Sequence, residues 1–255
     1  MQLLMKTYRI LIFLLLVSIS TYHVACTKIA PITTTDTTNT TIDTTTTLVK
    51  PTVKFFNVMD YGNIAVTFNK VNLGEVALYY PYPANSYTNG IIGTNNIVVK
   101  FGGETKIDVN VDLLANKSYS IFVYRVGYDW KLSVVTDDLT LPGTGKAKVR
   151  VLDFRTQAYF DYVKVKFSSL GSVDTLRYNN RNFLDHASYD TYTKFNTLPS
   201  GSYNMVIFND TANLANRTSL QLSSNKIYSM IMVTKASLES KDAIYQINID
   251  WKVNK

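Results

Sequence analysis

The sequence predicts an all-β protein, with two tandem antiparallel β-sandwiches of the immunoglobulin-like or transthyretin-like kind. Three observations support this. Apolar and polar residues alternate in many segments, which is the pattern of half-buried strands. Aromatic residues make up 13% of the chain and include eighteen tyrosines, and aromatic side chains favour strands. Finally, no long run of apolar residues has helical spacing.

Strands are expected from Pro51 onward, where the composition changes. The clearest alternation is KIDVNVD at Lys106–Asp112, in which the three apolar residues share one face. Gly127 begins a short turn between two further strands. The expected strands of the first half are Thr52–Val58, Asn63–Asn69, Lys106–Asp112, Ser118–Val126 and Trp130–Thr136.

The segment Leu141–Gly145 (LPGTG) interrupts the alternation and is the expected boundary between the two sandwiches. It fits a sortase pentapeptide, but a long β-rich sequence follows it, so we reject that interpretation. Short helical turns are expected only at Leu113–Lys117 and Lys235–Lys241. The expected strands beyond the boundary are Lys146–Phe154, Asp161–Phe167 and Ala243–Val253.

The two halves also resemble each other along their length. Three segments of the first half can be laid on three of the second, in the same order and about one hundred residues apart. The pairs are Thr52–Val58 with Lys148–Phe154, Asn96–Phe101 with Tyr203–Phe208, and Asn116–Ile121 with Asn225–Met230. The repeat predicts two copies of one sandwich, of about seven short strands each.

The N-terminal region predicts export and a lipid anchor. A basic start, a short apolar run and small Ala25 describe a signal peptide over residues 1–25. The run is shorter than the ~20 residues of a spanning helix. His23–Cys26 resembles a bacterial lipoprotein box, although His23 stands where leucine is usual. The resemblance implies a lipid thioether on Cys26, the chain's single cysteine.

Residues 26–50 are rich in threonine and predict a disordered linker to the lipid anchor. The resulting division is 1–25 signal peptide, 26–50 linker, 51–141 first sandwich and 146–255 second sandwich. The net charge of +7 comes from scattered basic residues rather than a basic run, so no nucleic-acid partner is expected.

Three segments of the second half carry a family resemblance. They are AKVRVLDF at Ala147–Phe154, YTKFNTLPSGSY at Tyr192–Tyr203 and NKIYSMIMV at Asn225–Val233. They resemble domain-of-unknown-function family 4397, found singly or in tandem on secreted proteins and lipoproteins of Bacteroidota and other bacteria. The first half fits the same outline more loosely, through NKSYSIFVY at Asn116–Tyr124. The resemblance implies a fold and an outer-membrane setting, and no activity.

Catalytic and metal-binding patterns are not found in the sequence. After removal of residues 1–25, His186 is the single histidine, and it is expected to be a solvated loop residue. Asp137 and Asp138 are expected to be structural turn residues. Zinc would need several His or Cys ligands, and no Gly-rich phosphate loop is present. We therefore expect no enzyme activity, no metal and no cofactor.

The remaining candidate for function is aromatic. Its residues are Tyr79, Tyr80, Tyr82, Tyr87 and Trp130. Aromatic side chains stack on sugars or anchor partner proteins, and the adjacent prolines would hold them in place. The alternative is that these side chains pack over the sandwich edge.

The sequence therefore predicts a monomeric, non-enzymatic, lipid-anchored protein of the cell envelope that presents two β-sandwiches for binding or adhesion. It would sit in the outer membrane, on either the cell surface or the periplasmic face, and bind a glycan or an envelope protein. The alternatives are a glycan-binding accessory lipoprotein of a polysaccharide uptake system and a pilus or adhesin subunit.

Overall fold

The computed structural model describes residues 48–59, 62–83, 86–155, 163–169, 174–208, 213–234 and 242–248. The chain divides into Met1–Thr46 and Thr47–Lys255, and all that follows concerns the second unit. The predicted signal peptide, Cys26 and nearly all of the linker lie outside the described residues. So do the predicted helical turn at Lys235–Lys241 and the end of the last predicted strand.

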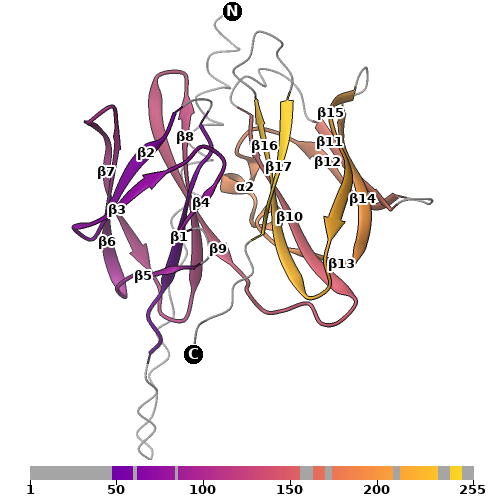
Figure 1. Cartoon of the computed structure of the whole chain (residues 1–255), viewed down its shortest axis with the longest axis horizontal. Coiled ribbons are helices and arrows are strands. Elements are labelled where there is room, and N and C mark those ends of the chain that lie inside the picture. Colours follow the sequence, from indigo (N-terminus) through magenta and orange to yellow (C-terminus); the bar gives the residue numbers. More distant parts are fainter. Residues whose placement is uncertain are drawn as a thin grey trace, which may run out of the picture. The chain divides into compact units, whose positions relative to one another are not determined.

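The fold is all-β, as the alternation predicts, with each half made of two sheets (Figure 1). In the first half one sheet has the order β4-β1-β8-β9, with β5 also beside β1, and the other has the order β3-β2-β6-β7. The strands are β1 (Thr52–Asn57), β2 (Ile64–Phe68), β3 (Val71–Val76), β4 (Pro81–Tyr82), β5 (Thr88–Asn89), β6 (Gly93–Phe101), β7 (Glu104–Leu113), β8 (Ser118–Val126) and β9 (Asp129–Asp137).

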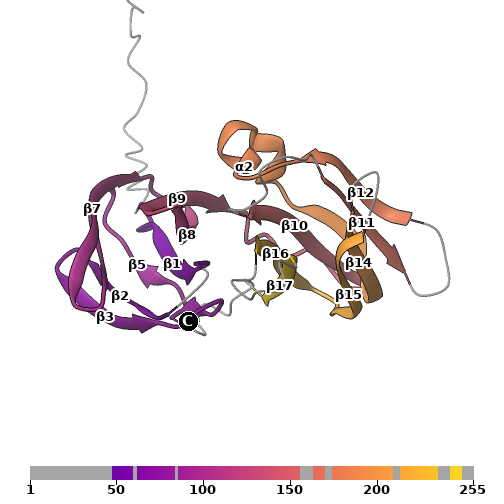
Figure 2. The same cartoon turned by 90° about the horizontal axis from the view of Figure 1, so that it is seen from above.

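The second half has the sheet orders β13-β10-β16-β17 and β12-β11-β14-β15, whose two layers are visible in Figure 2. A short helix, α2 (Asp185–Ser188), and a 3₁₀ turn, η1 (Asp190–Tyr192), follow β12. The strands are β10 (Lys146–Phe154), β11 (Val163–Ser169), β12 (Asp174–Arg181), β13 (Asn196–Pro199), β14 (Gly201–Phe208), β15 (Asn213–Leu222), β16 (Lys226–Thr234) and β17 (Asp242–Asn248).

Both halves therefore have one strand order, and their registers agree with the sequence repeat. Thr52 pairs with Ser118, and Lys148 pairs with Ile227, at the positions that the repeat aligns. These two pairings, β1 with β8 and β10 with β16, are parallel, whereas the predicted sandwiches were antiparallel. A parallel pair needs a long connection, and the other strands of each half supply it.

Equivalent turns also precede β8 and β16. Asn116 and Asn225 have positive φ values of 59° and 60°, a conformation that asparagine tolerates better than most residues. After each turn a tyrosine hydroxyl accepts a hydrogen bond of 3.0 Å from the backbone N–H five residues earlier. Tyr119 accepts from Leu114, and Tyr228 accepts from Ser223. The two halves thus share local contacts as well as strand order.

Among the described residues, three apolar clusters form the core. One lies inside each sandwich. The third contains residues of both halves, including Phe56, Phe122, Leu152, Phe154 and Ile231. Because side chains alternate along a strand, β1, β8, β10 and β16 each contribute one face to a sandwich core and the other to this third cluster. We call the region around it the junction.

The helical prediction at Leu113–Lys117 was wrong, since Leu113 ends β7 and a turn follows. The described helix instead lies at Asp185–Ser188, in a segment expected to be a polar loop. Among the described residues, no helix has the length and apolar character needed to span a membrane.

Candidate functional site: the junction of the two β-sandwiches

A buried arginine lies at the centre of the junction. Arg150 is on β10, on the face turned away from the core of its own sandwich, and its side chain is 0% exposed. Its Nε donates to Ser229 Oγ at 2.7 Å, and its Nη1 donates to the carbonyl oxygen of Thr136 at 3.1 Å. Nη2 donates to Asp137 Oδ1 at 2.5 Å. An arginine of the second half is therefore paired with a carboxylate of the first.

The carboxylate of Asp137 also accepts hydrogen bonds from its own half. The hydroxyls of Ser120 and Tyr87 donate to its Oδ2 at 2.7 and 2.8 Å. Burial, followed by the negative charge of Asp137, raises the pKa of the Tyr87 hydroxyl well above its ordinary value. Lys54 Nζ lies 4.9 Å from the centre of the Tyr87 ring. Asp137 is thus a buried acceptor, and its predicted role as a turn residue was wrong.

The sequence repeat contains a signal for this network that the sequence analysis did not use. In the aligned strands Lys54 and Arg150 occupy the same position, as do Ser120 and Ser229 on the neighbouring strands. Both cations are buried, although lysine and arginine are rarely buried without a partner. A cationic side chain on a strand usually faces solvent. The alternation within one strand therefore gave no reason to expect Lys54 and Arg150 to be buried.

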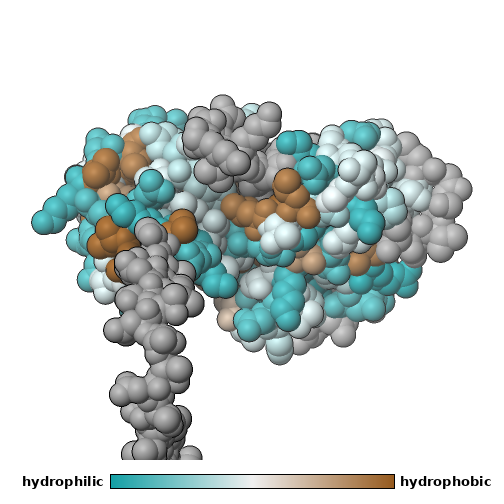
Figure 3. Space-filling view, turned by 90° about the horizontal axis from the view of Figure 1, so that it is seen from below, coloured by the Kyte–Doolittle hydropathy of each residue, from teal (hydrophilic) through white to brown (hydrophobic). Residues whose placement is uncertain are grey.

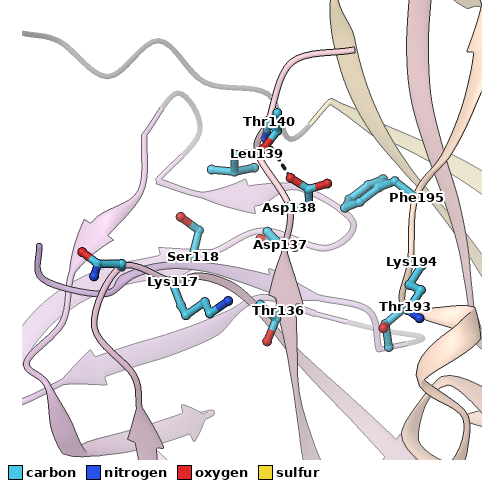
Figure 4. Close-up of a pocket in the computed structure, with 11 residues that line it drawn as sticks. Lys117, Ser118, Thr136, Asp137, Asp138, Leu139, Thr140, Thr193, Lys194 and Phe195 are labelled. Carbon is cyan, nitrogen blue, oxygen red and sulfur yellow. Dashed lines mark hydrogen bonds between the residues drawn. The ribbon is translucent and has the colours of Figure 1, made fainter.

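A cavity of about 690 Å³ lies beside this network. Figure 4 shows Lys117 extending toward Thr136, with Thr193 and Phe195 coming from the segment after η1. The residues that line the cavity are Asn116, Lys117, Ser118, Thr136, Asp137, Asp138, Leu139, Thr140, Thr193, Lys194 and Phe195. Most of them are polar, with one aromatic ring and one leucine.

The charges of the cavity are unevenly compensated. Asp137 is paired with Arg150, and Asp138 is paired with Lys148 at 2.6 Å. Burial acts to raise the pKa of Asp138, but hydrogen bonds from Lys148 and Thr140 hold it below its usual value. Lys117 and Lys194 have no ion-pair partner among the described residues. The lining therefore carries two uncompensated positive charges.

A second buried ionic group lies in the second half. Arg181 Nε donates to Asp185 Oδ2 at 2.5 Å, and its Nη2 donates to the carbonyl oxygen of Val151 at 2.8 Å. Arg155 pairs with Asp153. Burial raises the pKa of the Asp153 carboxyl, against the opposing effect of Arg155. These carboxylates are held by arginines.

His186 is buried on α2, with 4% of its surface exposed, so its predicted solvation was wrong. Its ring packs on Phe154, with centroids 4.9 Å apart, and Nε2 lies 3.3 Å from Ser133 Oγ. Burial lowers its pKa to about 4. Among the described residues, Nδ1 has no hydrogen-bond partner, and Asp185 is bound by Arg181. The pair thus lacks the third group that orients a catalytic histidine.

The predicted aromatic residues are not brought together as one exposed surface. Tyr80 is 69% exposed, whereas Tyr79 packs against the junction cluster, and Tyr82 and Trp130 pack against the first core. Trp130 also contacts Phe101, with ring centroids 5.4 Å apart. Tyr87 belongs to the Asp137 network. Tyr80 is the member of the set whose ring is mostly free for a ligand.

The rest of the described surface gives less specific indications. On the face shown in Figure 3 it is mostly hydrophilic, with apolar residues in separate patches. The described residues contain no group of three or more His, Cys, Asp or Glu residues placed to hold a metal ion. The cavity is therefore the most specific candidate site in the described part of the chain.

Comparisons with known proteins give a family match for part of the chain. Residues 50–159 match the model of a domain of unknown function, DUF4397. No curated protein matches the chain. One similar solved structure is "a putative cell adhesion protein from Bacteroides eggerthii DSM 20697", 7% identical, covering 80% of this chain and 96% of that chain with a TM-score of 0.25. A TM-score this low transfers neither fold nor function.

The family match falls on the first half and β10, where the sequence resemblance was looser. For the second half, which carried the fuller set of motifs, membership in the family stays a prediction. Residues 50–159 therefore match DUF4397, a family whose description names no activity.

Proposed function

We propose that this chain is a non-enzymatic, lipid-anchored protein of the cell envelope, whose two tandem DUF4397-type sandwiches present a ligand-binding cavity at their junction. The observation that carries the proposal is the cavity itself. Its volume of about 690 Å³ falls in the range of ligand pockets, ~300–1,000 Å³. Its lining offers hydroxyls, amides and ammonium groups for recognition.

The arrangement of reactive groups supports binding rather than turnover. A general acid or base must reach the substrate's proton, but Asp137 is held by Arg150, Ser120 and Tyr87. Asp138 is held by Lys148. In the described part of the chain, the Ser133–His186 pair has no orienting carboxylate, and it does not line the cavity.

The proposed anchor rests on the lipoprotein-like box that ends at Cys26. Several acyl chains on that residue would hold the protein in the membrane, since burial contributes ~0.8 kcal/mol per CH₂. The threonine-rich linker would then connect the sandwiches to the lipid. Surface and periplasmic orientations both fit this proposal.

The proposal is tested by incubating the purified full-length chain in detergent with polysaccharides extracted from the cell envelope. Co-sedimentation should show binding, while chromatography of the polymers should show no new fragments after prolonged incubation. Fragments that accumulate with time and protein concentration would contradict the non-enzymatic function. Failure to bind envelope polysaccharides or envelope proteins would contradict the binding function.

A second candidate is a glycan-binding accessory that uses Tyr80 on the first half. The observation in its favour is the 69% exposure of that ring. Tyr80→Ala should then abolish binding on a glycan array without lowering the melting temperature. Tyr128, which is 94% exposed on another turn, is the matched control, because Tyr128→Ala removes a similar ring elsewhere. Equal binding by both variants and the native chain would exclude this candidate.

A further inference from the structure

The charges and shape of the junction cavity indicate the class of its ligand. We infer that the cavity binds an acidic saccharide, whose anionic groups are held by Lys117 and Lys194 and whose ring packs on Phe195. This inference rests on the proposed binding function and adds the ligand class. It also names the two residues that would determine specificity.

Two positive charges of the cavity lining are uncompensated among the described residues. The two carboxylates of the lining are each paired, whereas the described residues offer no carboxylate to Lys117 or Lys194. The two lysines come from different segments, one before β8 and one after η1. An acidic saccharide could place one anionic group at each lysine, and charge-assisted hydrogen bonds are stronger than neutral ones.

The remaining lining groups suit a sugar better than a simple anion. Hydroxyls of Ser118, Thr136 and Thr140 and the amide of Asn116 line the cavity and can both donate and accept. Phe195 provides an apolar surface, and the Arg150 guanidinium lies 4.5 Å from its ring centre. A sugar ring has the matching combination of hydroxyls and apolar C–H groups.

The test is calorimetric titration of the full-length chain in detergent with three oligosaccharides of matched length. These are an oligogalacturonate, which carries carboxylates, a sulfated galactose oligosaccharide, and a neutral galactose oligosaccharide. At least one acidic sugar should bind about tenfold or more tightly than the neutral one. Its affinity should fall as salt rises, because ions screen charge interactions. The acidic sugar that binds more tightly shows whether the cavity recognises carboxylate or sulfate groups.

The variant Lys117→Ala/Lys194→Ala should reduce the affinity for the acidic sugar about tenfold or more. The matched control is Lys100→Ala/Lys131→Ala, which removes the same charge from two exposed lysines that do not line the cavity and should leave the affinity unchanged. Both lysines of the cavity variant are exposed, so the melting temperature should stay near that of the native chain.

Three results would overturn the inference. Equal binding of acidic and neutral sugars, unaffected by the cavity variant, would refute the charge argument and leave the proposed binding function standing. Binding of an oligoglutamate peptide in preference to every sugar would assign the cavity to a protein partner. Binding of none of the four probes would refute the ligand class, while binding of an envelope polysaccharide or an envelope protein would leave the proposed function standing.

Discussion

The Arg150–Asp137 pair provides the sharpest stability prediction. Both side chains are 0% exposed, so replacing Asp137 with asparagine leaves a buried guanidinium without its counter-charge. Breaking a buried pair in this way costs about 3–5 kcal/mol. Since a domain is stable by only about 5–15 kcal/mol, Asp137→Asn should remove a large part of the free energy of unfolding.

Urea unfolding of the native chain and three variants measures this effect. Asp138→Asn is the matched control, because Asp138 is adjacent, paired with a lysine and 58% exposed; it should cost about 0.2–1 kcal/mol. In the double variant Asp137→Leu/Arg150→Met no charge is left unpaired. It should therefore be more stable than Asp137→Asn, although the hydroxyls of Ser120 and Tyr87 lose their acceptor.

A loss of stability in Asp137→Asn no larger than that in Asp138→Asn would refute this prediction. That result would mean that water reaches the pair and that the junction is not desolvated. A double variant less stable than Asp137→Asn would equally contradict the argument, since the cost is assigned to the uncompensated charge.

The other predictions concern separate parts of the fold. Burial lowers the pKa of His186 to about 4 from 6.5, so the unfolded chain binds the proton of this side chain more tightly than the folded chain. The contribution of His186 to the free energy of unfolding should be full above pH 6.5 and fall by about 3 kcal/mol as the pH drops toward 4. Unfolding curves of His186→Gln, measured across this pH range, should lack that fall. Tyr119→Phe and Tyr228→Phe should each cost about 0.5–1.5 kcal/mol in urea unfolding, because each hydroxyl accepts one backbone hydrogen bond, and a negligible cost for either would contradict that contact. Phe122→Ala should cost about 3–5 kcal/mol, because this buried ring contacts two other rings of the junction, and a change in melting temperature no larger than that of Tyr80→Ala would contradict its burial.

The strands with strong alternation could be predicted from the sequence. Ser118–Val126 and Lys146–Phe154 are strands with the bounds expected from their pattern. By contrast, Val71–Val76 was missed, because VNLGEV lacks regular alternation and contains Gly74 with a φ of 95°. That strand is defined by its pairing with β2, which local sequence does not reveal.

The candidate site could not be predicted because it depends on contacts between the halves. Periodicity separates two faces of a strand but does not say that the polar face will also be covered. By periodicity alone Arg150 belongs to the polar face of an alternating strand, and Asp137 was expected to be a structural turn residue. Comparison of the aligned positions of Lys54 and Arg150 was the one signal that could have suggested a shared, buried role.

The central claim of a lipid-anchored binding protein is tested most directly at Cys26. Cells expressing the native chain or Cys26→Ala are grown with an alkyne fatty acid, and the labelled protein is measured in the membrane and soluble fractions. We predict label on the native chain in the membrane fraction, and an unlabelled Cys26→Ala variant that is no longer held by lipid. A native chain without label, or label that persists in Cys26→Ala, would contradict the anchor and the account of function based on it.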